Sequence, residues 1–267
     1  SFTDSGVATW HGRARFVGPN AVEVEGEKLE ASHIVLATGA EPIPLGIPGE
    51  EHLIDNEGFL EMESLPRRIL LVGGGYIAAE FSHIAARAGA EVTILQHGER
   101  MLKGFDPDLV GWLMEKYAEL GVKLHTDTTV VRIEQVDGAF RVTAGGESGS
   151  TTFDADLVVH AAGRKPDLAS LDLEAGNVEL RDGQIALTEH LQSVSNPAVY
   201  AAGDTSQMGP PLTPVSNHDG KIVAANLLDG NHRTPNYKGV PSVAFTLPPI
   251  ASVGLGEAEA RAKGFDF

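Results

Sequence analysis

The 267-residue sequence predicts an α/β protein with a parallel sheet, and three observations support this fold class. Between residues 68 and 160, apolar strand-like runs alternate with two helical patterns, as in parallel strands joined by right-handed crossovers. A triple glycine at 73–75 joins the first of these runs to a helix. The segment 41–49 contains three prolines and two glycines, which predicts a linker and the first domain boundary.

Three short apolar runs precede the linker and are expected to be strands, at 12–17, 21–25 and 33–37. The turn Gly18-Pro19-Asn20 joins the first two runs. The third run is apolar throughout, which is typical of a strand that is covered on both faces. We therefore expect a small sheet before the linker.

The region from 68 to 160 is the most periodic part of the chain. Helices are expected at 76–87 and 107–120, the second with Asp106 as N-cap and Pro107 in its first position. The residues predicted to form the buried face of the first helix are Ile77, Phe81, Ile84, Ala85 and Ala88. The expected strands are 68–72, 91–95, 122–125, 129–135, 140–144 and 156–160, and 145–150 is expected to be a hairpin tip.

The remaining part of the chain continues the alternation of strands and helices. A strand is expected at 196–202 and a helix at about 215–228. Two strands at 241–245 and 250–254 then lead to the start of a helix at 257–263.

The composition excludes several classes of function. The chain has 37 acidic and 20 basic residues, a net charge of −17, which disfavours nucleic acid and anionic membranes as partners. It contains no cysteine, so these residues hold no disulfide, thiolate zinc site or iron–sulfur site. The histidines are scattered without metal-like spacing, and no metal site is expected. The lack of a long apolar run or a signal-peptide pattern predicts a cytoplasmic protein.

The glycine turn carries the clearest chemical signal. Gly73-x-Gly75-x-x-Ala78 follows an apolar strand and opens a helix, which is the context that a dinucleotide fingerprint requires. Gly73 permits the tight turn, Gly75 lets a pyrophosphate approach bare N–H groups, and Ala78 lets the helix pack close to the strand. The alternative is a tight turn without a ligand.

The end of the following strand predicts which nucleotide binds. NAD sites have an acid about 20 residues beyond the fingerprint, but here the strand runs into Gln96 and His97. Arg100 and Lys103 follow, and cationic groups suit the 2′-phosphate of NADP. The sequence favours NADP, with two alternatives left open: Glu99 turns inward and serves NAD, or the cations are ordinary surface charges.

Two further residues stand where a ligand is expected. Asp204 follows the apolar strand 196–202, and ligands of parallel sheets bind at the carboxyl ends of the strands. It either accepts hydrogen bonds from a ligand hydroxyl or caps its own turn. Thr213 lies near the start of a long helix, whose N-terminal N–H groups would favour an electron-rich ring edge such as that of a reduced flavin.

Six motifs in one order resemble a known family. They are HIVLATGAEPIPLGIPG, VGGGYIAAEF, AAGRKPD, VYAAGDT, LTPV and PPIASVGLGEAEA, and they span most of the chain. Together they resemble the FAD-dependent pyridine nucleotide–disulfide oxidoreductases, and most closely the glutathione reductase-like branch. The resemblance implies a Rossmann-like dinucleotide-binding domain inserted in a partial FAD-binding domain, followed by the start of an α+β interface domain.

The resemblance also predicts the domain boundaries. It implies the first part of an FAD-binding domain at 1–46, an NAD(P)-binding domain at 47–170, the FAD-domain return at 171–236 and an interface domain from 237 to 267. Family members carry an FAD-binding glycine motif and a cysteine pair before these segments, and a His–Glu pair after them. None of these is in the chain, which therefore looks like an internal segment of such a protein.

Residue by residue, the resemblance implies these roles. Thr38 and Gly39 lie beside the FAD, Asp204 holds its ribityl chain, and Thr213 lies near the pyrimidine edge of its ring. Tyr76 is the aromatic gate over the flavin, and Glu80 is an acid near the nicotinamide; these two are the candidate catalytic residues. The expected cofactor-binding residues are Thr38, Gly39, Gly73, Gly75, Tyr76, Ile77, Ala78, Gln96, His97, Lys103, Gly163, Arg164, Asp204 and Thr213.

The family implies hydride transfer from NADPH to FAD, and then reduction of a small-molecule disulfide by a homodimeric enzyme. Because the chain lacks cysteine, a cysteine-free flavoprotein such as a soluble transhydrogenase is an alternative. A second alternative concerns the chain by itself, which would be a nucleotide-binding module without turnover.

Overall fold

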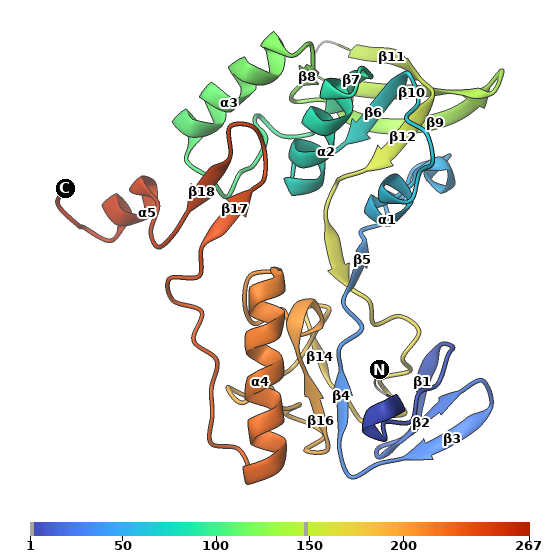
Figure 1. Ribbon diagram of the computed structural model, residues 1–267, viewed down its shortest axis with the longest axis vertical. Helices are drawn as coiled ribbons and strands as arrows, with labels where there is room; N and C mark the ends of the chain where they lie inside the picture. Colours follow the sequence, from blue (N-terminus) through green and yellow to red (C-terminus); the bar gives the residue numbers. More distant parts are fainter. Residues whose placement is uncertain (1–2, 147–148) are drawn as a thin grey trace. The chain divides into compact units, whose positions relative to one another are not determined.

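The computed structural model describes residues 3–146 and 149–267, and it divides into two units (Figure 1). Unit 1 comprises Ser1–Glu41 and Lys165–Lys238, and unit 2 comprises Pro42–Arg164 and Gly239–Phe267. The linker predicted at 41–49 thus begins where the chain first enters unit 2. The finer division into four functional domains stays a prediction.

A four-stranded parallel sheet forms the centre of unit 2, in the order β12-β6-β7-β8. Its strands are β6 (Arg68–Val72), β7 (Glu91–Leu95), β8 (Lys123–His125) and β12 (Leu157–His160). Alternate residues of β6 enter different cores: Ile69 and Leu71 pack on one face, and Leu70 and Val72 on the other. The parallel sheet predicted from the apolar runs is confirmed.

Two helices connect the parallel strands, α2 (Tyr76–Arg87) after β6 and α3 (Pro107–Glu119) after β7. Asp106 caps α3 as predicted, because its carboxylate accepts the amide hydrogens of Asp108 and Leu109 at 2.9 and 3.3 Å. The predicted buried face of α2 was partly wrong, since Ile84 is 50% exposed and Ala88 is also exposed. Phe81 and Ala85 are buried as predicted. The structure adds four buried residues that were not predicted: Ala78, Ala79, Ser82 and His83.

An antiparallel sheet of three strands lies between β8 and β12 in the sequence. It has the order β11-β10-β9, with β9 (Thr129–Val136), β10 (Ala139–Gly146) and β11 (Gly149–Ala155). The third strand, β11, was not predicted. Of the expected hairpin tip at 145–150, residues 147 and 148 lie outside the described residues.

The other elements of unit 2 are short. They are η2 (Glu50–His52), α1 (Asn56–Leu60), β17 (Ser242–Ala244), β18 (Ile250–Ser252) and α5 (Glu257–Ala262). The hairpin of β17 and β18 packs against α2 through Ala244 and Ile250, which are buried in the same core. Where the chain passes between the units, β5 (Ala40–Pro42) pairs with β13 (Arg164–Pro166).

Unit 1 combines a small antiparallel sheet with a parallel strand pair. The antiparallel sheet has β1 (Ala14–Gly18), β2 (Ala21–Val24) and β3 (Glu27–Glu30). In the parallel pair, β4 (Ile34–Leu36) lies beside β16 (Val199–Ala201). The remaining elements are η1 (Thr3–Ser5), β14 (Leu180–Arg181), β15 (Gln184–Ile185), η3 (Gly203–Thr205) and α4 (Thr213–Asp229). Among the helices described in both units, none is long and apolar enough to cross a membrane.

Asp156 joins the starts of β6 and β12. Its Oδ2 accepts the backbone N–H of Arg68 at 2.9 Å, and its Oδ1 accepts from the Arg68 guanidinium. The side-chain hydrogen bond from Arg68 holds the pKa of Asp156 below its ordinary value of 3.8. Because the pKa is lower in the folded state, the pair stabilises the fold at neutral pH, and this contribution is lost as the pH falls below 3.8.

We therefore expect Asp156→Asn to lower the urea midpoint of unfolding at pH 7. The effect should be modest, because both side chains are about one-third exposed and solvent screens the pair. Parallel urea titrations of the two proteins at pH 7 and pH 3 measure it, and the difference in midpoint should shrink at pH 3. An equal difference at both pH values would contradict the assignment.

Candidate functional site

The glycine turn after β6 is shaped by close backbone contact. Gly73 has φ +114° and donates its N–H to the carbonyl of Leu95 at 2.8 Å. A β-carbon on Gly73 would lie 2.2 Å from the backbone oxygen of Ala161, which follows β12. Only glycine therefore fits this position, and the turn is held at the carboxyl edge of the parallel sheet.

The start of α2 is open to a ligand. Gly75 is the N-cap, and a β-carbon added there would meet its nearest neighbour, the Ala161 oxygen, only at 3.9 Å. No side chain caps the helix and its first turn carries no acid. Ala78 is fully buried and lets α2 pack close to the sheet. Free N–H groups at the positive end of a helix favour an anion such as a pyrophosphate.

The two candidate catalytic residues both lie on α2. Tyr76 is the first residue of the helix, is 38% exposed and packs edge-on against Phe105 at 5.7 Å between ring centroids. Glu80 lies one turn further on, and its carboxylate accepts the N–H of Phe245 at 3.0 Å. His83, which the sequence analysis overlooked, is buried and contacts the Phe245 carbonyl through Nε2 at 3.1 Å. Glu80 and His83 together attach the end of β17 to α2.

The basic residues of the loop after β7 differ in their surroundings: Arg100 is hydrogen-bonded within the loop, whereas His97 and Lys103 are exposed. The guanidinium of Arg100 donates to the carbonyls of Phe105 and Lys103 at 3.1 and 2.9 Å, so it stabilises the loop. His97 and Lys103 are exposed. A β-carbon on Gly98 would lie 2.9 Å from the Lys103 Nζ, which shows that the ammonium lies back against the strand end beside His97.

This loop is also attached to the glycine turn. Leu102 donates its N–H to the carbonyl of Gly74 at 2.8 Å. Gln96 is buried under the turn and donates from Nε2 to the Arg100 carbonyl at 3.2 Å. The structure thus brings the fingerprint and the residues expected to select the nucleotide to one edge of the sheet. Gly163 and Arg164 follow β12 along the same edge and are exposed.

In unit 1, the ends of β4 and β16 bring two predicted motifs together. The strands pair in parallel up to Leu36 and Ala201, so the segments that follow them emerge side by side. The Gly39 N–H donates to Thr205 Oγ1 at 2.7 Å, and Thr38 Oγ1 donates to the Asp167 carbonyl at 2.7 Å. Thr38, Gly39 and Asp204 therefore form one cluster.

Asp204 and Thr213 are both available to a ligand. Within residues 3–146 and 149–267, no hydrogen bond or ion pair engages the Asp204 carboxylate, which is half-buried. Thr213 is the first residue of the 17-residue helix α4, whose N-terminus has no side-chain cap and no acid in its first turn. A β-carbon on Gly203 would lie 2.8 Å from Ser216 Oγ, so the start of α4 lies against the turn that carries Asp204.

Sequence reasoning missed the buried carboxylate of Asp219 on α4. It is fully buried and lies behind the Gly203 turn, where it accepts the Gly203 N–H at 3.1 Å and the Tyr237 hydroxyl at 2.8 Å. Burial first, and then the hydrogen bond to Asp219, raises the pKa of Tyr237, so this hydroxyl keeps its proton. The available signal was helical spacing, because Asp219 lies among the apolar positions Val215 and Ile222.

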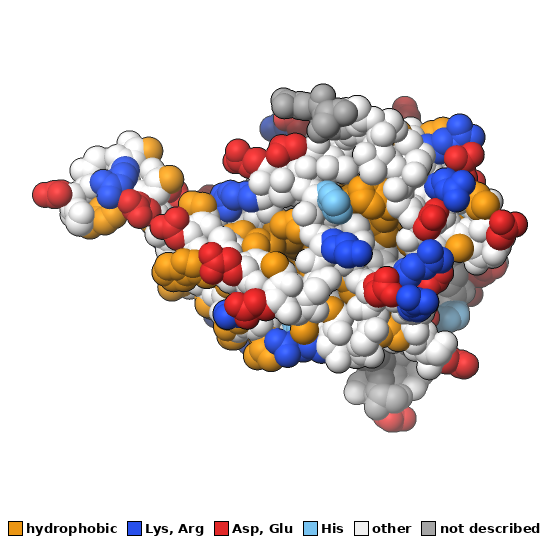
Figure 2. Space-filling view, turned by 90° about the horizontal axis from the view of Figure 1, so that it is seen from above, with side chains coloured by type: hydrophobic (Ala, Val, Ile, Leu, Met, Phe, Trp, Pro, Cys, Tyr) orange, Lys and Arg blue, Asp and Glu red, His pale blue; other side chains and the backbone are white. Residues whose placement is uncertain are grey.

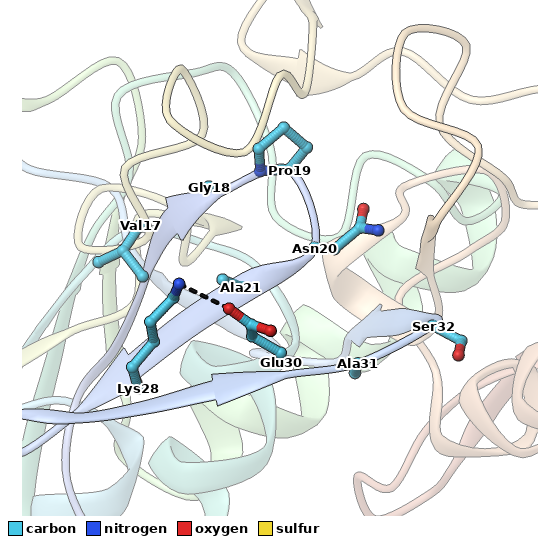
Figure 3. Close-up of a pocket in the computed structure, with 9 residues that line it drawn as sticks. All are labelled: Val17, Gly18, Pro19, Asn20, Ala21, Lys28, Glu30, Ala31 and Ser32. Atoms are coloured by element: carbon cyan, nitrogen blue, oxygen red, sulfur yellow. Dashed lines mark ion pairs between the residues drawn. The ribbon is translucent and has the colours of Figure 1, made fainter.

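One hollow in unit 1 lies apart from these residues. Its volume is about 670 Å³, and Figure 3 shows it over the turn between β1 and β2. Lys28 and Glu30 form an ion pair across it at 2.6 Å. None of the predicted site residues lines it. On the face in Figure 2, Lys and Arg side chains lie scattered among Asp and Glu side chains.

Comparison with known proteins identifies a family. The family model described as pyridine nucleotide-disulphide oxidoreductase matches residues 1–220. A mercuric reductase from Staphylococcus aureus is 36% identical over 258 residues, covering 96% of this chain and 47% of that protein. A glutathione reductase from Burkholderia cepacia is 36% identical over 263 residues, covering 97% and 57%.

Solved structures give the same result. The HOCl-induced flavoprotein disulfide reductase RclA from Escherichia coli matches with a TM-score of 0.86 and 27% identity, covering 96% of this chain and 59% of that one. The chain spans about half the length of the curated relatives that it matches. The family match covers residues 1–220 of 267, which is most of the chain. The chain belongs to the pyridine nucleotide–disulphide oxidoreductase family.

Proposed function

We propose that the chain is the nucleotide-binding part, and one wall of the flavin site, of an enzyme that passes hydride from NADPH to FAD and reduces a small-molecule disulfide. The observation that carries this proposal is the open glycine turn. Gly73 is fixed against Ala161, a β-carbon on Gly75 would meet no atom closer than 3.9 Å, and no side chain caps the first N–H groups of α2. This geometry suits a dinucleotide pyrophosphate.

The residues at the end of β7 favour NADPH over NADH as the nucleotide. His97 and Lys103 lie together at the end of β7 and can donate to a 2′-phosphate, whereas Arg100 is engaged by loop carbonyls. Gln96 is buried and supports the turn from below. The alternative is NAD, for which the exposed Glu99 would accept the ribose hydroxyls. Ile77, Gly163 and Arg164 complete the nucleotide site in this proposal.

The flavin contacts lie in unit 1. Asp204 offers an unpaired carboxylate to a ribityl hydroxyl, and Thr38 and Gly39 line the neighbouring strand end. The N-terminus of α4, at Thr213, supplies partial positive charge where a reduced ring gains electron density. FAD, when bound, supplies the hydride acceptor. Tyr76 would cover the flavin until the nicotinamide arrives, and Glu80 would position the nicotinamide together with the end of β17.

The test uses the full-length protein that contains this segment. It should show flavin absorbance and oxidise NADPH when a disulfide such as oxidised glutathione is supplied. The stoichiometry should be one NADPH for each disulfide, with two thiols formed. Flavin absorbance and NADPH oxidation without thiol formation would instead support the cysteine-free alternative, a transhydrogenase-like flavoprotein.

We also propose that the full protein is a cytoplasmic homodimer of the glutathione reductase-like branch. Gel filtration would test the dimer, and cell fractionation would test the location.

A second candidate function applies to the 267 residues alone, which contain no cysteine for a redox pair. In this proposal the chain is a module that binds NADP(H) without turnover. It should bind FAD poorly, because the ADP half of FAD needs a glycine fingerprint of its own and the chain carries one fingerprint, at Gly73. Isothermal titration with FAD decides this point, and stoichiometric tight binding would refute it.

A further inference from the structure

The carboxylate of Asp219 lies in the interior of unit 1. The residue is 0% exposed, and within residues 3–146 and 149–267 it takes part in no ion pair. Burying a carboxylate costs several kcal/mol unless hydrogen bonds compensate. It receives such bonds from the Gly203 N–H on Oδ2 at 3.1 Å and from the Tyr237 hydroxyl on Oδ1 at 2.8 Å. The Ser206 hydroxyl donates to the Gly203 carbonyl at 2.8 Å and, more weakly, to Oδ2 at 3.3 Å.

Two of these donors belong to one short turn. Gly203 begins η3, with φ +65°, and Ser206 directly follows its last residue. Between them stands Asp204, whose own carboxylate has no partner in the described part of the chain. A single oxygen of Asp219 thus bridges the two ends of the turn that presents Asp204.

The same turn is held from the opposite side by the neighbouring strand end. Thr205 is fully buried, and its Oγ1 accepts the N–H of Gly39 at 2.7 Å. The turn therefore lies between Asp219 on one side and Gly39 on the other. Any movement of η3 away from α4 would disturb the Gly39 contact as well.

Tyr237 fixes the orientation of the carboxylate. Its ring packs against Gly209, where a β-carbon would lie 2.5 Å away, and edge-on against His218 at 6.2 Å. His218 in turn accepts the N–H of Asn236 through Nε2 at 3.2 Å. With its ring held in this way, the hydroxyl of Tyr237 reaches Asp219 from the last segment of unit 1, which ends at Lys238.

We propose that Asp219 is a positioning residue that fixes the Gly203–Ser206 turn, so that Asp204 and Gly39 keep one relative geometry for the ligand. Tyr237 supports this role because its hydroxyl donates to Asp219 and fixes the orientation of the carboxylate. The inference rests on the proposed function in one respect: the ligand at Asp204 is taken to be the flavin.

The test follows amide hydrogen exchange in the 267-residue chain, without any flavin. The reporter is the Gly39 amide, which does not touch Asp219 but contacts the turn through Thr205. Asp219→Asn keeps the shape of the side chain and replaces one acceptor oxygen with a donor. We expect it to speed exchange at Gly203 and at Gly39 by about tenfold or more, because the turn opens locally. Thr205→Val, which removes the direct acceptor, should give a similar increase at Gly39.

The matched control is Asn226→Asp on the same helix. Asn226 is 2% exposed and donates to the carbonyls of His190 and Arg233, away from the turn. It should destabilise α4 without a selective change at Gly39. If Asp219→Asn instead speeds Gly203 alone, or speeds exchange uniformly as Asn226→Asp does, the positioning role is overturned.

A milder variant keeps the test decisive if Asp219→Asn does not fold. Tyr237→Phe removes one donor and should speed Gly39 exchange about threefold, and an unchanged rate would overturn the proposal. Because these readouts need no flavin, they are separate from the proposed function.

A second experiment uses the full-length protein loaded with flavin. There, Asp219→Asn should weaken FAD binding but add little to the effect of Asp204→Asn, since both changes remove the same contact to the ligand. Full additivity would show that Asp219 acts elsewhere. No FAD binding by the unmutated full-length protein would refute the proposed function instead.

Discussion

Gly73→Ala should reduce the free energy of unfolding of unit 2 by about 3 kcal/mol or more, the largest stability effect that we expect of any single substitution. The added β-carbon would lie 2.2 Å from the Ala161 oxygen, and all of its nearest neighbours are backbone atoms of Ala161 and Ala162. This backbone cannot move away without disturbing the sheet, because Ala161 donates its N–H to the Val72 carbonyl at 2.8 Å. The φ of +114° adds strain for any residue with a side chain.

Two other glycines serve as controls for this prediction. Gly75→Ala leaves 3.9 Å to the nearest backbone atom and should fold normally while it binds nucleotide more weakly. Gly104→Ala meets no atom within 4 Å and should change neither property. Thermal unfolding followed by circular dichroism measures the stabilities. A Gly73→Ala protein as stable as the Gly104→Ala protein would show that the turn is not built as described.

The second large effect concerns the choice of nucleotide. Replacing both His97 and Lys103 with Gln should weaken NADPH binding about 100-fold, since each charge-assisted hydrogen bond to a phosphate contributes roughly 1.5 kcal/mol. NADH binding should change less than about threefold, because NADH lacks the 2′-phosphate. Fluorescence titrations with both nucleotides measure the ratio.

Arg100→Gln is the informative comparison for that experiment. Its guanidinium supports the loop carbonyls of Lys103 and Phe105, so its loss should weaken NADPH and NADH alike. If Arg100→Gln removes the preference for NADPH and the double variant does not, the roles of the three cations are reversed. Equal loss of both nucleotides in the double variant would favour NAD as the natural ligand.

The sequence predicted well those parts of the fold that depend on local rules. The apolar runs of β6 and β7 and the cap at Asp106 are recognisable without tertiary contacts, and their bounds agree with the structure. The buried face of α2 was less predictable. Packing close to a sheet selects small residues such as Ala78 and Ser82, whereas a search for large apolar residues placed Ile84 in the core. The short strand β11 carries mostly exposed polar residues and gave no apolar signal.

In the candidate site, too, some features can be predicted from the sequence and others cannot. Backbone-based features such as Gly73 are visible in the sequence because only glycine permits them. The hydrogen bonds from Arg100 to the loop carbonyls cannot be predicted from the sequence, since they depend on the conformation of the loop after β7. Helical spacing indicates that Asp219 is buried, but it does not reveal the donors Gly203 and Tyr237, which lie 16 and 18 residues away in the sequence.

We propose that the turn at Gly73–Gly75 binds the pyrophosphate of NADPH. The most direct measurement is calorimetric titration of the 267-residue chain and its Gly75→Ala variant with NADPH and NADH. We predict one NADPH site, about 100-fold tighter than for NADH, and a loss of about tenfold or more for both nucleotides in the variant at unchanged stability. Nucleotide binding that the variant leaves intact, or no binding by the unmutated chain, would contradict the claim.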